Sequence, residues 1–120
     1  MRELNIGTKA HTVVKSEVEK EFNAYHEYYI SRSDIKDTTP VGEFGHVKFQ
    51  KGPIKENGIN GCHHEDLIAI VIDRLQCFQD SEYKCRENAL AITKLEESLH
   101  WLRHRTDSRK SRGVEGTKAV

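Results

Sequence analysis

Hydrophobic and polar residues alternate in three short segments in the first half of the chain. These segments run over residues 8–16, 22–32 and 43–50, and polar residues separate the β-forming ones within them. Alternation with a period of two is typical of a strand with one buried face. The pattern therefore predicts three short strands, with an exposed loop over residues 34–41, where Thr38-Thr-Pro interrupts it.

A single helix over residues 16–30 is the alternative for the middle segment. Val18, Phe22, Tyr25 and Tyr29 recur at spacings of three and four, and the Glu and Lys content of the segment suits a helix. We favour the strand. After the third strand, glycine, asparagine and proline concentrate over residues 52–61, and these residues permit positive φ or fix a turn. We expect a hinge here, which divides the chain into a β lobe with hinge (1–61) and a helical region (62–120).

The hydrophobic period changes to that of a helix beyond residue 62. A one-face helical stripe predicts a first helix over residues 64–79, formed by Leu67, Ile68, Val71, Ile72, Leu75 and Phe78. A polar break follows and offers Ser81 as the N-cap of a second helix over residues 83–110. The stripe on that helix comprises Ala91, Ile92, Leu95, Leu99 and Leu102. We therefore expect an α+β fold, with a small N-terminal antiparallel β-sheet followed by an antiparallel helical hairpin and a C-terminal arm.

A second apolar face lies on the later helix. Leu90 and Trp101 share this face, beside Lys94 and Arg105. A two-helix hairpin has too little interior to bury two faces. The second face therefore predicts a homo-oligomer or contact with the β lobe, and we expect the homo-oligomer.

Composition narrows the class of protein. The longest apolar run, Leu67 to Ile72, is far shorter than the roughly 20 residues of a membrane span. The first residues lack the apolar core of a signal peptide, so we expect a cytoplasmic protein. The 19 basic and 19 acidic side chains balance, which argues against a dedicated DNA-binding protein. Three cysteines without a Cys-x-x-Cys pair predict reduced thiols.

The end of the second helix is the strongest local concentration of charge. Here Asp107 is the one acidic residue among five basic ones, Arg103, Arg105, Arg109, Lys110 and Arg112. Arg105 and Arg109 are four residues apart, so they share a helical face and could grip phosphate oxygens. The alternative is that these cations favour the helix dipole and remain solvated.

A second candidate lies where the two helices meet. Phe78 ends the first helix, and Arg86 and Asn88 open the second. An aromatic ring with an amide and a guanidinium nearby is what a nucleobase needs for stacking and for hydrogen bonds to its edge. Alternatively, Phe78 closes the hairpin core and Arg86 pairs with Glu82 or Glu87.

Histidines and cysteines give weaker signals. Cys62-His63-His64 lies in the expected hinge region, and His100 and His104 have the spacing that can share a metal. Neither set has a third well-spaced ligand, so we expect no metal and no cofactor. The sequence also has no phosphate-binding loop and no nucleophile elbow. It gives little support to an enzyme.

Five motifs follow one another along the chain. The three longest are Phe49-Gln-Lys-Gly-Pro-Ile-Lys-Glu-Asn-Gly-Ile-Asn-Gly, Glu65-Asp-Leu-Ile-Ala-Ile-Val-Ile-Asp-Arg-Leu and Cys85-Arg-Glu-Asn-Ala-Leu-Ala-Ile-Thr-Lys-Leu-Glu-Glu. Two shorter ones are Trp101-Leu-Arg-His-Arg-Thr and Arg112-Gly-Val-Glu-Gly-Thr. Together, in this order, they resemble the phage Thoeris anti-defence family, which shares a helical-hairpin domain with the phage anti-CBASS sponges. The resemblance covers about residues 43–117.

This resemblance implies a molecular sponge in the host bacterial cytoplasm. Members of the family bind cyclic nucleotide immune signals, such as cyclic ADP-ribose isomers, without breaking a bond, and some relatives also bind cyclic oligonucleotides. The resemblance further implies an N-terminal antiparallel sheet and a dimer or hexamer. By position, Phe78 would stack on the base, Asn88 would hydrogen-bond to the ligand, and Arg105 would hold phosphate. From their charge and their place in or beside the motifs, we add Arg86, Arg109 and Lys51.

Two other classes of function stay open. A nucleic-acid-binding regulator would use the arginine-rich end of the second helix, although the zero net charge counts against it. A nucleotide-cleaving enzyme would rest on Cys62 and His63. We expect the sponge.

Overall fold

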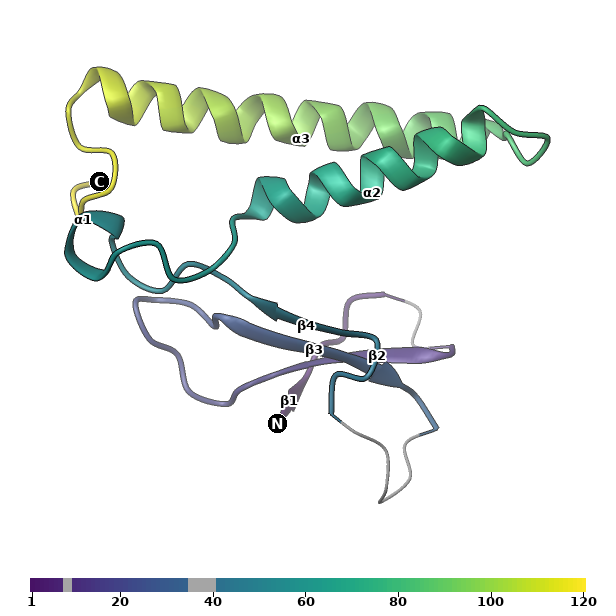
Figure 1. Ribbon diagram of the computed structural model, residues 1–120, viewed down its shortest axis with the longest axis horizontal. Helices are drawn as coiled ribbons and strands as arrows, with labels where there is room; N and C mark the ends of the chain where they lie inside the picture. The colour runs from purple at the N-terminus through teal and green to yellow at the C-terminus, as the bar shows by residue number, and fades with distance from the viewer. Residues whose placement is uncertain (8–9, 35–40) are drawn as a thin grey trace. The chain divides into compact units, whose positions relative to one another are not determined.

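The structure, a computed structural model, describes residues 1–7, 10–34 and 41–120. It divides into two compact units, Met1–Cys62 and His63–Val120. The first unit contains a four-stranded antiparallel sheet and the second an antiparallel pair of helices (Figure 1). The α+β class and the order of sheet and hairpin are confirmed.

The sheet is a meander in which each strand pairs with the next along the chain. Its strands are β1 (Arg2–Glu3), β2 (Thr12–Ser16), β3 (Glu27–Arg32) and β4 (Gly45–Lys48), in the order β1-β2-β3-β4. Residues 8–9 of the first expected strand, and 35–40 of the expected loop, lie outside the described residues. Strand β1 was not predicted, because two residues are too few to show alternation.

The sheet unit buries small polar groups as well as apolar ones. Val13 is 7% exposed, while Ser16 and Ser31 are 0% and 4% exposed. These hydroxyls are hydrogen-bonded: Ser16 Oγ accepts from Arg2 Nε at 2.9 Å, and Ser31 Oγ accepts from the Gly42 amide at 2.8 Å. Burial without a penalty is possible because each hydroxyl has a partner.

Strand β3 begins at Glu27, so the prediction that it starts at residue 22 is wrong. Phe22 and Asn23 have positive φ angles of 46° and 70°. They form a tight turn in which the Glu21 and Ala24 backbones exchange two hydrogen bonds of 3.1 Å. Two successive positive φ angles are typical of a hairpin turn. The helix alternative for residues 16–30 is wrong for the same reason, and β4 is shorter than the expected 43–50.

The glycine-rich segment contains a helical turn, α1 (Ile54–Asn57), that the sequence pattern did not predict. Two side chains close this segment into a loop. Gln50 Nε2 donates to the Gly58 carbonyl at 2.8 Å, and Asn60 Oδ1 accepts from the Lys51 amide at 2.7 Å. Gly61 is required at the end of the loop, because a Cβ atom there would lie 2.4 Å from the backbone of Phe49.

The hairpin consists of α2 (His64–Gln79) and α3 (Arg86–Ser111). The bounds of α2 are as predicted, but α3 starts later than residue 83. Cys85, not Ser81, is its N-cap, and Cys85 Sγ accepts from the Asn88 amide at 3.4 Å. Ser81 stabilises the preceding turn instead, since its Oγ donates to the Phe78 carbonyl at 2.6 Å.

The packing of the hairpin is looser than the hydrophobic stripes predict. Ile92 is 8% exposed, but Val71 and Phe78 are 46% and 37% exposed. Leu90 and Trp101, on the second apolar face, are 46% and 60% exposed. In the part of the chain that the structure covers, no helix is long and apolar enough to span a membrane.

Candidate ligand-binding site

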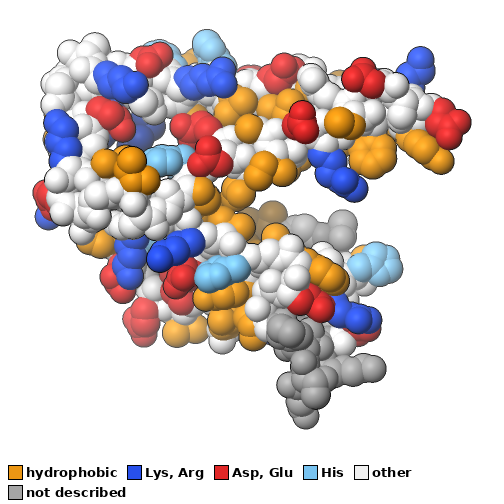
Figure 2. Space-filling model, viewed as in Figure 1, with side chains coloured by type: hydrophobic (Ala, Val, Ile, Leu, Met, Phe, Trp, Pro, Cys, Tyr) orange, Lys and Arg blue, Asp and Glu red, His pale blue; other side chains and the backbone are white. Residues whose placement is uncertain are grey.

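A shallow groove runs along one face of α2, near the loop that joins the two helices. It is lined by Ala69, Ile70, Asp73, Arg74, Cys77 and Phe78. The half-buried residues of α2 that pack on the hairpin lie on a different face, among them Ile68, Ile72 and Leu75. At this end of the hairpin, Figure 2 shows exposed hydrophobic side chains beside a basic one.

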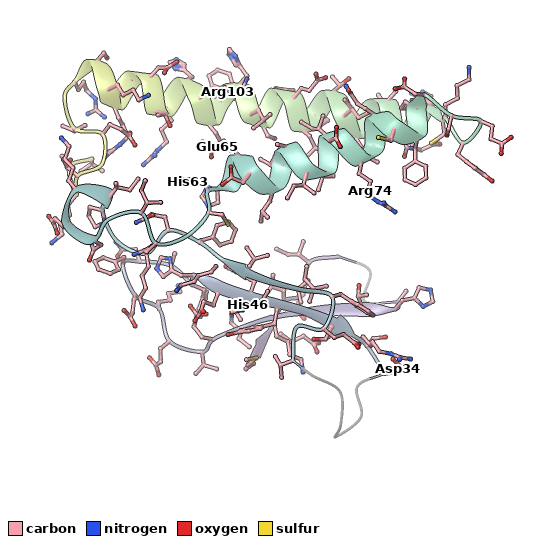
Figure 3. All side chains as sticks on the ribbon, viewed as in Figure 1. Asp34, His46, His63, Glu65, Arg74 and Arg103 are labelled. Carbon is pink, nitrogen blue, oxygen red and sulfur yellow. The ribbon has the colours of Figure 1, made fainter. Side chains whose placement is uncertain are left out.

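The groove brings a ring and a guanidinium together. Arg74 Cζ lies 5.1 Å from the centroid of the Phe78 ring, a distance typical of a cation–π contact. The two residues are four apart on α2, so the helix itself aligns them. Figure 3 shows the Arg74 side chain extending from α2 away from α3. Sequence reasoning missed Arg74, although its spacing to Phe78 was the signal that could have found it.

The start of α3 presents two further candidate residues beside this loop. Gln79 holds the loop closed, because its amide donates to the Cys85 carbonyl at 3.0 Å and accepts from the Cys85 amide at 2.9 Å. Arg86 is exposed, and the described residues include no acidic partner for it. Asn88 is half-buried. The end of α2 and the start of α3 therefore bring Phe78, Arg86 and Asn88 to the same end of the hairpin.

Arg105 lies at the other end of α3. It follows Asn88 by 17 positions, which is about 25 Å along a helix that rises about 1.5 Å per residue. Arg105 is exposed, and no hydrogen bond or ion pair occupies it in the described ranges. One hairpin therefore does not bring Arg105 to the same place as Phe78 and Asn88.

Arg109 is buried, in contrast to Arg105. It is 8% exposed, and its guanidinium donates to three carbonyls of the C-terminal arm, residues 113–120. These bonds measure 2.6 Å to Ala119, 3.0 Å to Val114 and 3.1 Å to Thr117. Arg109 Nε also lies 3.4 Å from Glu115 Oε2. The charge pattern of the sequence predicted that the Arg109 guanidinium binds an anion, but in the structure this guanidinium binds the carbonyls of the arm.

Lys51 lies in a separate pocket within the first unit. Its Nζ is 3.0 Å from Glu21 Oε2, and three more glutamates, Glu17, Glu19 and Glu27, line the same pocket. Burial acts to raise the pKa of Glu17, but the amides of His26 and Glu27 donate to its carboxylate, and the net effect lowers that pKa. This pocket is therefore more acidic than basic around Lys51.

The histidines and cysteines do not assemble into a metal centre in the described residues, where no group of three His, Cys, Asp or Glu side chains could hold an ion. His104 instead stacks on Trp101, with ring centroids 5.8 Å apart and planes inclined by 17°. His100 meets the same indole edge-on at 5.4 Å. A shallow groove beside them is lined by His100, Arg103, His104, Asp107, Ser108 and Ser111 (Figure 3 labels Arg103).

The geometry defines a small α+β protein whose helical hairpin carries an exposed ring with a neighbouring uncommitted guanidinium. Residues 43–107 match the family model described as Acb2/Tad1, hairpin domain, and the chain belongs to this family. The family resemblance noted in the sequence is confirmed. Lys51, Phe78, Arg86, Asn88 and Arg105 fall within the matched range, and Arg109 lies just beyond it.

A curated relative supports the same assignment. The chain is 62% identical over 77 residues to a protein named Thoeris anti-defense 1 from Bacillus phage SBSphiJ7. The alignment covers 64% of this chain and 54% of the relative. The chain thus spans about half the length of the curated relative that it matches.

Proposed function

We propose that this protein is a phage anti-defence sponge in the host bacterial cytoplasm. It binds a cyclic nucleotide immune signal, with cyclic ADP-ribose isomers as the first class of ligand and cyclic oligonucleotides as the second. It holds the signal intact and acts without catalysis or a cofactor. This proposal rests on the 62% sequence identity to Thoeris anti-defense 1 over 77 residues, together with the hairpin family match over residues 43–107.

The chemistry of the candidate residues supports a nucleotide as ligand. Phe78 offers an exposed ring for a base, and Asn88 offers an amide for hydrogen bonds at the same end of the hairpin. Arg86 and Arg105 offer guanidiniums that can grip phosphate oxygens bidentately. Lys51 and Arg109 are weaker candidates, because Glu21 pairs with the first and the arm occupies the second.

The length of α3 supports a site formed by two copies of the chain. Asn88 and Arg105 lie about 25 Å apart along one helix, which is longer than a single cyclic ADP-ribose molecule can bridge. If two hairpins pack antiparallel, the loop end of one meets the arginine end of its partner. The exposed Leu90 and Trp101 side chains supply an apolar surface for such packing. We therefore propose a homodimer, which could assemble further into a hexamer.

Titration calorimetry tests the proposed function. The purified protein is titrated with cyclic ADP-ribose isomers, with cyclic di- and trinucleotides, and with duplex DNA. The complex is then heat-denatured and the released ligand is analysed. We expect stoichiometric binding of one cyclic nucleotide and its recovery unchanged. A cleaved ligand would contradict the sponge, and binding of DNA alone would favour a nucleic-acid-binding regulator.

Complementation tests the two-copy site. Asn88→Ala and Arg105→Ala variants should each bind weakly, because each damages every site of its own homodimer. After unfolding and refolding together, mixed dimers should contain one intact site and one doubly damaged site. Binding should then reappear at about half of the wild-type stoichiometry within mixed dimers. No recovery in verified mixed dimers would contradict a site shared in this way.

A further inference from the structure

Arg74 stands out on the hairpin as a guanidinium beside the candidate base-binding ring. It makes no hydrogen bond and no ion pair in the described part of the chain, and its Cζ lies 5.1 Å from the centroid of the Phe78 ring. Asp73 lines the same groove, yet no ion pair joins the two side chains. Arg74 therefore keeps all its N–H donors available, whereas Arg109 donates to three carbonyls.

We infer that Arg74 is a ligand-binding residue that leaves the Phe78 ring and donates to a phosphate of the bound cyclic nucleotide. This inference rests on the proposed function. A base that stacks on the ring face covered by Arg74 must displace the guanidinium, and the long arginine side chain can swing aside without moving the helix. The displaced guanidinium then lies next to the bound nucleotide.

The balance of interactions favours this exchange. A cation–π contact at an exposed site is weak, whereas a bidentate bond from a guanidinium to a phosphate is charge-assisted and geometrically matched. Without ligand, Arg74 shields the Phe78 ring, which is 37% exposed, from part of the solvent. With ligand, the base takes over this role and Arg74 gains an anionic partner. The same four-residue spacing on α2 serves both states.

Binding measurements on Arg74→Ala and Arg74→Lys test this inference. Lys55→Ala is the matched control, because it removes one positive charge from an exposed position on α1, outside the hairpin residues assigned to the ligand and to the dimer. Each variant is titrated with the cyclic ADP-ribose isomer that the wild-type protein binds, at low and high salt. Light scattering after gel filtration checks that every variant keeps the wild-type mass.

We expect Arg74→Ala to weaken binding by about tenfold or more, as loss of a charge-assisted bidentate contact does. Arg74→Lys should lie between this variant and the wild type, because an ammonium keeps the charge but loses the fork. Lys55→Ala should stay within about twofold. Arg74→Ala should also show a shallower salt dependence of Kd, since one fewer ion pair forms on binding.

Three results would overturn the inference while leaving the sponge intact. They are wild-type affinity in Arg74→Ala, an equal loss in Lys55→Ala, and a loss with an unchanged salt dependence, which would mean that Arg74 contacts the base. If Arg74→Ala changes the oligomeric mass, Arg74→Lys decides, and wild-type affinity in that variant overturns the bidentate contact. If the wild-type protein binds no cyclic nucleotide at all, the proposed function fails and this inference falls with it.

Discussion

Replacing Arg109 by alanine should release the C-terminal arm. The guanidinium is 8% exposed and donates to the carbonyls of Val114, Thr117 and Ala119. At about 1.5 kcal/mol each, the low end of the range for hydrogen bonds to a charged group, three such bonds sum to roughly 4.5 kcal/mol if nothing replaces them. Once the arm undocks, water satisfies the freed carbonyls. We therefore expect the free energy of unfolding to fall by about 2–3 kcal/mol.

Urea unfolding and hydrogen exchange measure this effect. The Thr117 amide, which donates to the Val114 carbonyl at 3.1 Å, should exchange much faster in Arg109→Ala than in the wild type. Arg112→Ala is the control, because Arg112 donates one exposed hydrogen bond to the arm, at 2.9 Å to the Val120 carbonyl. Its effect should stay below about 0.5 kcal/mol.

An unchanged stability and an unchanged exchange rate in Arg109→Ala would refute this reasoning. The arm would then be held by other contacts, and the Arg109 guanidinium would be available to a ligand. A loss of cyclic nucleotide affinity without a loss of stability would point the same way, to a direct phosphate contact. The two measurements thus separate an arm-holding role from a ligand-binding role at one residue.

Three further changes have defined outcomes. Phe78→Ala should weaken ligand binding by about 1–3 kcal/mol, measured by calorimetry, if a base stacks on the ring; an effect confined to thermal stability would assign Phe78 to the core. Arg105→Ala should weaken binding and leave the oligomer intact by light scattering, and dissociation to monomers would place Arg105 in the interface instead. The lowered pKa of Glu17 stabilises the fold above the ordinary glutamate pKa, and this contribution is lost as pH falls through the folded-state value. Glu17→Gln should therefore flatten the acid limb of unfolding free energy against pH, and an unchanged limb would show that Glu17 contributes little.

Helical periodicity was the most informative signal in the sequence. The apolar stripe of α2 repeats over four turns, and the predicted bounds, His64 and Gln79, are those observed. Alternation predicted the bounds of the strands less well, because a few alternating residues cannot reveal a turn within the segment. Nothing in the alternation shows that Phe22 adopts a positive φ angle, which most side chains avoid. The two-residue β1 and the single turn α1 are too short to generate any period.

The start of α3 shows a different limit. Ser81 is the more common type of N-cap residue, yet Cys85 holds that place because Gln79 binds the Cys85 backbone from both sides. Such a clasp depends on two residues six positions apart that share no sequence signature. The loop therefore extends further than capping preferences alone predict.

The candidate site shows why charge predicts location better than role. Arg74, Arg105 and Arg109 carry the same formal charge, but their donors differ in what they can still bind. Arg109 donates its N–H groups to carbonyls of the arm. In the described residues, Arg105 has no hydrogen-bond or ion-pair partner, and Arg74 makes a cation–π contact with the Phe78 ring but no hydrogen bond. Burial of an arginine against backbone carbonyls requires the chain to fold back on itself, which local sequence does not encode. A guanidinium is available to an anionic ligand only where the fold leaves it without acceptors, so we place phosphate at Arg74 and Arg105 before Arg109.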